Sequence, residues 1–135
     1  MCGQYGRRVM SDRELNEKPS VDAQLATLQA EYIANLYERV LPVLSLWQDY
    51  IASNYSPELL RDVYRKVHAI AGTSSILNVK PIDRLSNQVQ IKIQTVLQST
   101  DIETTLIAEI GLTLNEILDV AKSGDINAPP INLNT

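Results

Sequence analysis

Apolar residues recur at steps of three and four along most of this chain, and this period restricts the fold more than any other feature. The clearest series runs through Leu60, Val63, Val67, Ile70, Ser74 and Leu77. Such spacing places all its members on one face of an α-helix and is typical of helices packed in a bundle. No segment shows the alternation of a strand. The chain is therefore predicted to be all-α.

Start and stop signals divide this pattern into helices. Ser20 is a plausible N-cap, followed by an apolar series that runs to Ile51 as one long helix or two. Pro42 lies inside the series and lacks a backbone donor, so a kink or break is expected near Leu41. The series comprises Leu25, Leu28, Tyr32, Ile33, Leu36, Val40, Val43, Leu44, Trp47 and Ile51.

Three further helices follow. The second is expected to begin at Ser56 and Pro57 and to end at Asn78, which tolerates left-handed dihedral angles. The third is expected to start near Pro81, and the fourth to end at Gly124. The cap candidates of the fourth helix are Ser99, Thr100 and Asp101. The apolar stripe of the third helix is Ile82, Leu85, Val89, Ile93 and Val96. That of the fourth helix is Ile107, Ile110, Leu114, Ile117 and Ala121.

These signals predict an antiparallel four-helix bundle over residues 20–124. Residues 1–19 are polar and are expected to be largely mobile, with helical composition in the stretch SDRELNEK. Residues 125–135 are expected to form a non-helical tail. At 135 residues and 44% hydrophobic, the chain suits one domain with one core.

Composition narrows the possible functions. The net charge of −4 offers no basic field for nucleic acid or for an anionic membrane surface. No apolar run reaches the roughly 18 residues of a spanning helix, and the single cysteine, Cys2, has no partner for a disulfide within the chain. A soluble cytoplasmic protein with protein partners is expected.

The usual signatures of enzymes are missing from the sequence. There is no glycine-rich phosphate loop and no nucleophile elbow, and one His with one Cys makes a metal site improbable. The environment of His68 is then the most informative question. With 100° per residue, His68 lies ~130° from the apolar seam of its helix and points outward.

The flank around His68 is unusually small. Ala71, Gly72 and Ser75 follow it by three, four and seven positions on the same side. Side chains of a helix lean toward its N-terminus, so the residues three and four positions after His68 are the ones that would cover the imidazole, and here they are Ala71 and Gly72. A glycine within a helix costs about 1 kcal/mol relative to alanine, which suggests a steric reason for Gly72. The alternative is an ordinary surface histidine beside a tolerated glycine, and periodicity alone leaves both open.

The stretch His68-Ala69-Ile70-Ala71-Gly72-Thr73-Ser74-Ser75-Ile76-Leu77-Asn78 resembles the signature of histidine-containing phosphotransfer domains. The resemblance extends over roughly residues 22–123. Two positions depart from the family pattern: Ala71 stands where Lys is common, and Asn78 where Gly is common. Asn78 preserves the left-handed helix end, whereas Ala71 removes a cation near the phosphoryl group.

The resemblance implies a phosphoryl carrier rather than an independent catalyst. His68 would accept the phosphoryl group on its distal ring nitrogen and exchange it with the aspartate of a response-regulator receiver domain. A hybrid sensor histidine kinase is the other implied partner. This chain would bind no cofactor, because the receiver would supply Mg²⁺, a lysine and the aspartate.

The residues expected to dock a partner are Arg61, Tyr64, Arg65, Ala71, Gly72 and Ser75. Each has a structural alternative: Tyr64 closes the edge of the bundle, and the two arginines are solvated charges. Trp47 and Ser74 are read as structural. The competing functional class is a helical interaction module of the same shape that binds a receiver or another signalling partner without carrying phosphate.

Overall fold

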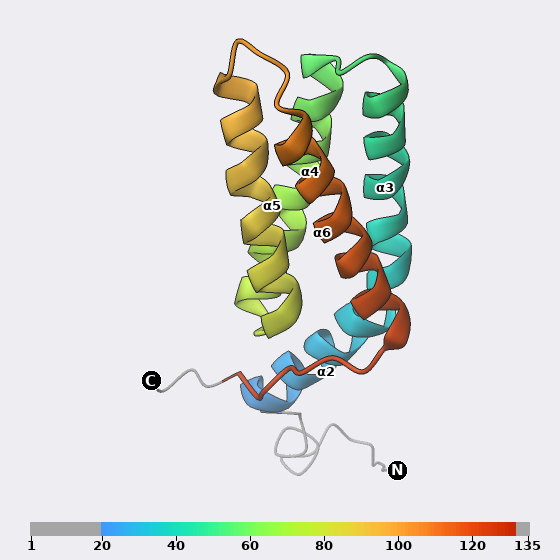
Figure 1. Ribbon diagram of the computed structural model, residues 1–135. Helices are drawn as coiled ribbons and strands as arrows, with labels where there is room; N and C mark the ends of the chain where they lie inside the picture. Colours follow the sequence, from blue (N-terminus) through green and yellow to red (C-terminus); the bar gives the residue numbers. More distant parts are fainter. Residues whose placement is uncertain (1–19, 132–135) are drawn as a thin grey trace, which may run out of the picture.

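The computed structural model describes residues 20–131, and within this range the chain is all-helical (Figure 1). Five α-helices and no strands are present in the described part, which confirms the predicted fold class. The helices are α2 (Val21–Ala34), α3 (Leu36–Ala52), α4 (Pro57–Ile76), α5 (Lys80–Gln98) and α6 (Thr104–Ser123). The expectations for residues 1–19 and 132–135 lie outside the described residues.

The arrangement of the helices is compatible with a helical bundle. Helix α3 packs against α4 and α6, and α5 packs against the same two helices. Figure 1 shows these four helices side by side, with α2 crossing one end of them. The hydrophobic cluster of the core consists of aliphatic side chains, tyrosines and one tryptophan, Trp47, and a few polar residues such as Ser74 and Ser86 are buried as well.

Most of the predicted apolar seams are buried. All six seam residues of α4 and all five of α6 are buried, as are the first four of α5. The prediction of buried residues is less accurate in the first helical region, because Leu28 is 52% exposed and Ile51 is 42% exposed. In place of Leu28, helix α2 buries the neighbouring Gln29, which has two backbone carbonyl partners.

The first helical region breaks at Asn35, and no break is present near Leu41, where one alternative of the prediction placed it. Helix α3 continues through Pro42, whereas α2 ends at Ala34 with Asn35 as its C-cap. The side-chain amide of Asn35 donates to the Glu31 carbonyl at 2.9 Å, and its backbone N–H reaches the same oxygen at 3.1 Å. An asparagine that binds the preceding turn in this way competes with helix propagation.

Two of the predicted caps are present and one is not. The hydroxyl oxygens of Ser20 and Ser56 accept from the backbone N–H groups of Ala23 and Leu59. Helix α6 instead begins at Thr104, beyond the cap candidates at 99–101. There the Ser99 hydroxyl bonds to both the N–H and the carbonyl of Asp101 and closes a turn in the connection.

The segment after α6 runs back along α2. Gly124 ends α6 in the left-handed region at φ 68°, and residues 125–131 follow without helical structure. The Pro129 carbonyl accepts from the side-chain amides of Gln29 at 3.0 Å and Asn78 at 2.9 Å. Asn78 itself has φ 61°, as predicted for the end of α4. The C-terminal segment thus joins α2 to the α4–α5 connection.

Candidate functional site

His68 lies exposed on α4, in agreement with its predicted angle to the seam. Its Nδ1 atom is 2.7 Å from Oε1 of Gln90 on α5. An amide oxygen only accepts, so Nδ1 carries the ring proton in this contact. The other ring nitrogen, Nε2, is then the one with a free lone pair in the neutral imidazole.

Gln90 is itself held by a further side chain of α5. Its Nε2 atom donates to Oδ1 of Asn87 at 3.1 Å. Asn87 in turn donates from Nδ2 to the backbone carbonyl and to Oδ1 of Asp83, each at 2.7 Å. A continuous chain of hydrogen bonds therefore leads from His68 to Asp83, and every donor in it points toward Asp83.

Tyr64 supports the other side of the imidazole. Its ring stacks on His68 with centroids 5.9 Å apart and planes inclined by 14°. The Tyr64 hydroxyl accepts from Nε2 of Gln94 at 2.9 Å, which ties the half-buried tyrosine to α5. The imidazole is thus restrained by one hydrogen bond and one stacking contact.

The small residues after His68 differ from one another in exposure. Gly72 and Ser75 are exposed, and a Cβ atom placed on Gly72 would meet nothing within 4 Å. Packing within the chain therefore does not explain this glycine. Ala71, predicted among the docking residues, is only 5% exposed, so its side chain offers little surface to a partner. It lies only ~70° from the seam, closer to it than His68.

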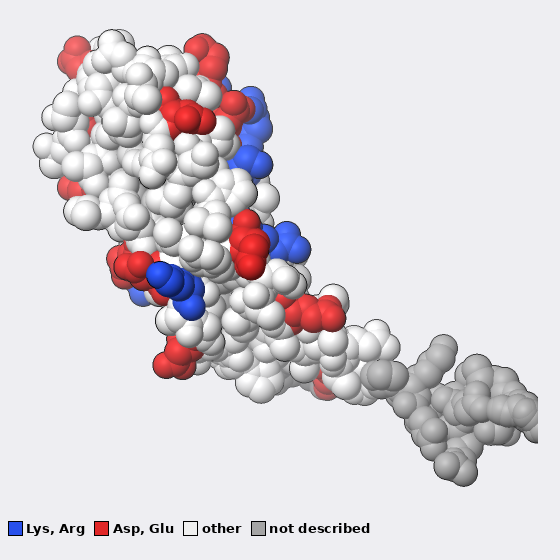
Figure 2. All heavy atoms as spheres, turned by 90° about the vertical axis from the view of Figure 1, so that its right-hand side faces the viewer, with Lys and Arg blue, Asp and Glu red and all other residues white. Residues whose placement is uncertain are grey.

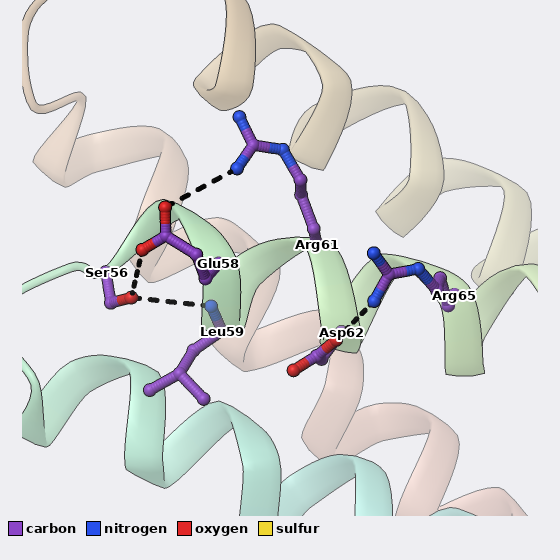
Figure 3. A network of polar contacts seen from close by, with 6 residues as sticks. All are labelled: Ser56, Glu58, Leu59, Arg61, Asp62 and Arg65. Atoms are coloured by element: carbon purple, nitrogen blue, oxygen red, sulfur yellow. Dashed lines mark hydrogen bonds and ion pairs between the residues drawn. The ribbon is translucent and has the colours of Figure 1, made fainter.

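Both predicted arginines bind acids on their own helix (Figure 3). Arg61 pairs with Glu58 at 3.8 Å, and Arg65 pairs with Asp62. All four side chains are substantially exposed, so these pairs contribute little to stability. In this arrangement both guanidinium groups are directed to carboxylates of α4.

A shallow hollow of about 260 Å³ adjoins the site at the groove between α4 and α5. It is lined by Arg61, Tyr64, Gln94, Leu97 and Gln98. On the neighbouring turn of α5, Ile91 is 64% exposed. Two predicted docking residues thus share a hollow with residues of α5 that the sequence argument did not name.

The sequence argument missed Gln90, Asn87 and Asp83. These residues follow one another at steps of four and three on α5, beside its apolar seam. A polar stripe of that period next to a buried one is a signal that was available. The polar stripe alone does not indicate a contact with His68, because only the packing of α5 on α4 brings Gln90 to the imidazole.

Charge and ligand chemistry add little to the site. On the face of the described residues drawn in Figure 2, basic side chains lie in small groups, several of them beside acidic ones, and form no continuous basic area. Among residues 20–131, no cluster of His, Cys, Asp and Glu side chains is suited to hold a metal ion. None of the described helices is both long enough and apolar enough to cross a membrane.

Comparisons with protein-family models, curated proteins and solved structures gave no match.

Proposed function

We propose that this chain is a histidine phosphotransfer protein of a two-component phosphorelay. His68 receives a phosphoryl group from the aspartate of a receiver domain, or delivers one to it. The observation that carries the proposal is the contact of Nδ1 with Gln90 on an exposed imidazole. It leaves Nε2 unprotonated and free to act as a nucleophile without an adjacent base.

The transfer step follows from this geometry. The Nε2 lone pair attacks the phosphorus of an aspartyl phosphate, the N–P bond forms, and the bond from phosphorus to the aspartate oxygen breaks. The aspartate leaves as a carboxylate, and Nδ1 keeps its proton. The positive charge that develops on the ring is stabilised by the Oε1 atom of Gln90. The receiver supplies Mg²⁺ and a lysine for the charge on the phosphoryl group.

The fold supports this role as a rigid platform. We infer that α3, α4, α5 and α6 form an antiparallel four-helix bundle, since each packs against two of the others and short connections join them. His68 and Gln90 then lie on adjacent, regular helices, which hold a site more precisely than loops do. A phosphorelay carrier of this kind belongs in the cytoplasm.

The receiver is proposed to dock over the groove between α4 and α5. The hollow beside Tyr64, the exposed Ile91 and the open space at Gly72 favour close approach of another protein around His68. Ile91 would add apolar area for a partner to bury, and Tyr64 is of a residue type enriched at such interfaces.

One observation favours the second candidate, an interaction module that binds a receiver without carrying phosphate. Ala71 stands where the resemblance would lead one to expect a lysine, and the guanidinium groups of Arg61 and Arg65 bind Glu58 and Asp62. In the carrier proposal, the partner's lysine and Mg²⁺ supply the positive charge that neutralises the phosphoryl group.

The experiment is incubation of the chain with phosphorylated receiver domains and Mg²⁺, followed by mass analysis of the chain and of His68→Gln. The carrier proposal predicts an acid-labile, alkali-stable adduct on the wild type and none on His68→Gln. Receiver binding without any adduct on the wild type would contradict it and favour the interaction module.

A further inference from the structure

We propose that Asn87 and Asp83 are positioning residues that determine which ring nitrogen of His68 carries the proton. The inference deepens the proposed function, because it names what sets the nucleophile of the same site. It rests on the polarity of the hydrogen-bond chain between α5 and α4, in which the longest link measures 3.1 Å.

The chain is anchored at Asp83. The Asp83 backbone carbonyl accepts hydrogen bonds but cannot donate, and an ionised carboxylate is likewise acceptor-only. Both oxygens lie 2.7 Å from the same atom of Asn87, which must therefore be the amide nitrogen. The reverse orientation would place the amide oxygen of Asn87 against two oxygens and leave all three without a proton between them.

The orientation of Asn87 fixes that of Gln90. With Nδ2 directed to Asp83, Asn87 presents its Oδ1 to Gln90, and only the amide nitrogen of Gln90 can donate to it at 3.1 Å. The remaining Gln90 atom, Oε1, is then directed to His68. Because Gln90 is only 9% exposed, water competes little for this orientation.

The last link acts on the imidazole. In a free neutral histidine the proton prefers Nε2, which would leave the outward nitrogen without a lone pair for attack. An acceptor fixed at 2.7 Å from Nδ1 reverses this preference. Two residues that never touch the ring thus determine that its outward nitrogen is the nucleophile.

The test is the ¹⁵N spectrum of the imidazole in the full chain, recorded at a pH above the range in which histidines titrate. The chain has one histidine, so the two ring signals need no assignment among several residues. The ratio of the Nδ1–H form to the Nε2–H form in the wild type is expected to be at least about fivefold higher than in a free neutral histidine, which corresponds to one hydrogen bond of about 1 kcal/mol. A wild type dominated by the Nε2–H form would overturn the proposal.

The decisive variant is Asn87→Leu, which removes both links at an exposed position while leaving Gln90 in place. The excess of the Nδ1–H form is expected to fall by about fivefold. The matched control is Asn115→Leu, because Asn115 on α6 bonds back to the Gly111 carbonyl at 2.9 Å in the same way but has no link to His68. An unchanged ratio in Asn87→Leu, or an equal change in Asn115→Leu, would overturn the proposal.

A conservative variant tests whether the hydrogen-bond acceptors of Asp83 or its negative charge orient Asn87. Asp83→Asn keeps the backbone carbonyl and one amide oxygen as acceptors, so the wild-type ratio is expected to persist. A ratio that falls in Asp83→Asn by as much as in Asn87→Leu would contradict an anchor made of acceptor oxygens. None of these spectra requires a phosphoryl donor, so their outcome is independent of whether His68 proves to carry phosphate.

Discussion

Helix α4 carries polar side-chain networks on two of its flanks, and the two differ in what surrounds them. Toward α5, His68, Asn87 and Asp83 lie at the surface or at its edge, whereas Gln90 between them is largely buried. Toward α2, the Ser74 hydroxyl is fully buried and lies 3.0 Å from the Tyr32 hydroxyl, which also reaches the Ile70 carbonyl at 3.4 Å. One turn further along, Gln29 of α2 donates to the Leu77 carbonyl at 2.8 Å.

The contacts toward α2 and those toward α5 are expected to contribute differently to the stability of the fold. A buried polar group without its partner costs about 1–3 kcal/mol, so the contacts toward α2 specify how that helix docks. At the surface water replaces a lost partner at little cost, so the contacts of the exposed His68 and Asn87 contribute orientation more than stability. Substitutions in the contacts toward α2 should therefore lower the free energy of unfolding. Substitutions in the contacts toward α5 should change which ring nitrogen of His68 carries the proton.

The strongest effect on stability is expected from Gln29→Glu. The substitution keeps the shape but places a carboxylate against the Leu77 and Pro129 carbonyls, which should lower the free energy of unfolding at neutral pH by about 3 kcal/mol or more. The introduced carboxyl group can donate a hydrogen bond again once it is protonated, so the loss should shrink as the pH falls. Denaturant unfolding over a pH series measures both effects.

The control for this substitution is Gln48→Glu at an exposed position of α3, expected to change stability by less than about 0.5 kcal/mol. Equal losses in the two variants, or a Gln29→Glu loss that does not depend on pH, would show that the carbonyl contacts of Gln29 do not hold α2.

A smaller loss is expected from Ser74→Ala. Removal of the hydroxyl deprives the Tyr32 hydroxyl of its shorter contact, at about 1–2 kcal/mol. Ser75→Ala, one residue along and exposed, should change the unfolding free energy by less than about 0.5 kcal/mol. Similar values for the two variants would mean that the buried contact contributes no more than a surface serine.

The same flank should respond to alkaline pH. Burial raises the pKa of Tyr32 above its ordinary value of 10.0, although the hydrogen bond with Ser74 and the charge of Arg39 oppose the shift. The folded state therefore holds the proton more tightly than the unfolded state, and this stability is present below pH 10 and lost as the pH rises through the folded pKa.

Tyr32→Phe should consequently show a shallower fall in unfolding free energy above about pH 10 than the wild type. Burial raises the pKa of Tyr50 as well, so Tyr50→Phe should shift the slope in the same direction and the fall should not vanish in either variant. A Tyr32→Phe slope equal to that of the wild type would contradict the raised pKa.

The smallest effect is expected from Arg65→Ala. Its exposed pair with Asp62 contributes at most about 0.5 kcal/mol, and its guanidinium group is directed to Asp62. Stability by denaturant unfolding and the ¹⁵N spectrum of His68 should both match the wild type. A changed imidazole spectrum would mean that Arg65 acts on the ring after all.

The features predictable from the sequence are those set by local period. The seam from Leu60 to Leu77, the Ser56 cap and the outward direction of His68 all follow from the helical repeat of about 3.6 residues per turn. The pairing of Arg65 with Asp62 was equally local, at a spacing of three, but was not drawn from the sequence.

The remaining features depend on which helix lies opposite. Gln29 is buried instead of Leu28 because the chain end and the α4–α5 connection supply carbonyls for its amide. Ala71 is buried, and Gln90 reaches His68, because α5 packs on that side of α4. No periodicity within one helix specifies such partners.

The most direct test of the account is to determine which nitrogen of His68 binds phosphorus. The chain labelled with ¹⁵N-histidine would be incubated with a phosphorylated receiver domain and Mg²⁺, and the one-bond nitrogen–phosphorus coupling would be recorded. The account predicts coupling at Nε2, with Nδ1 still directed to Gln90. Coupling at Nδ1, or a receiver that binds and loses its phosphate while His68 remains unmodified, would contradict it.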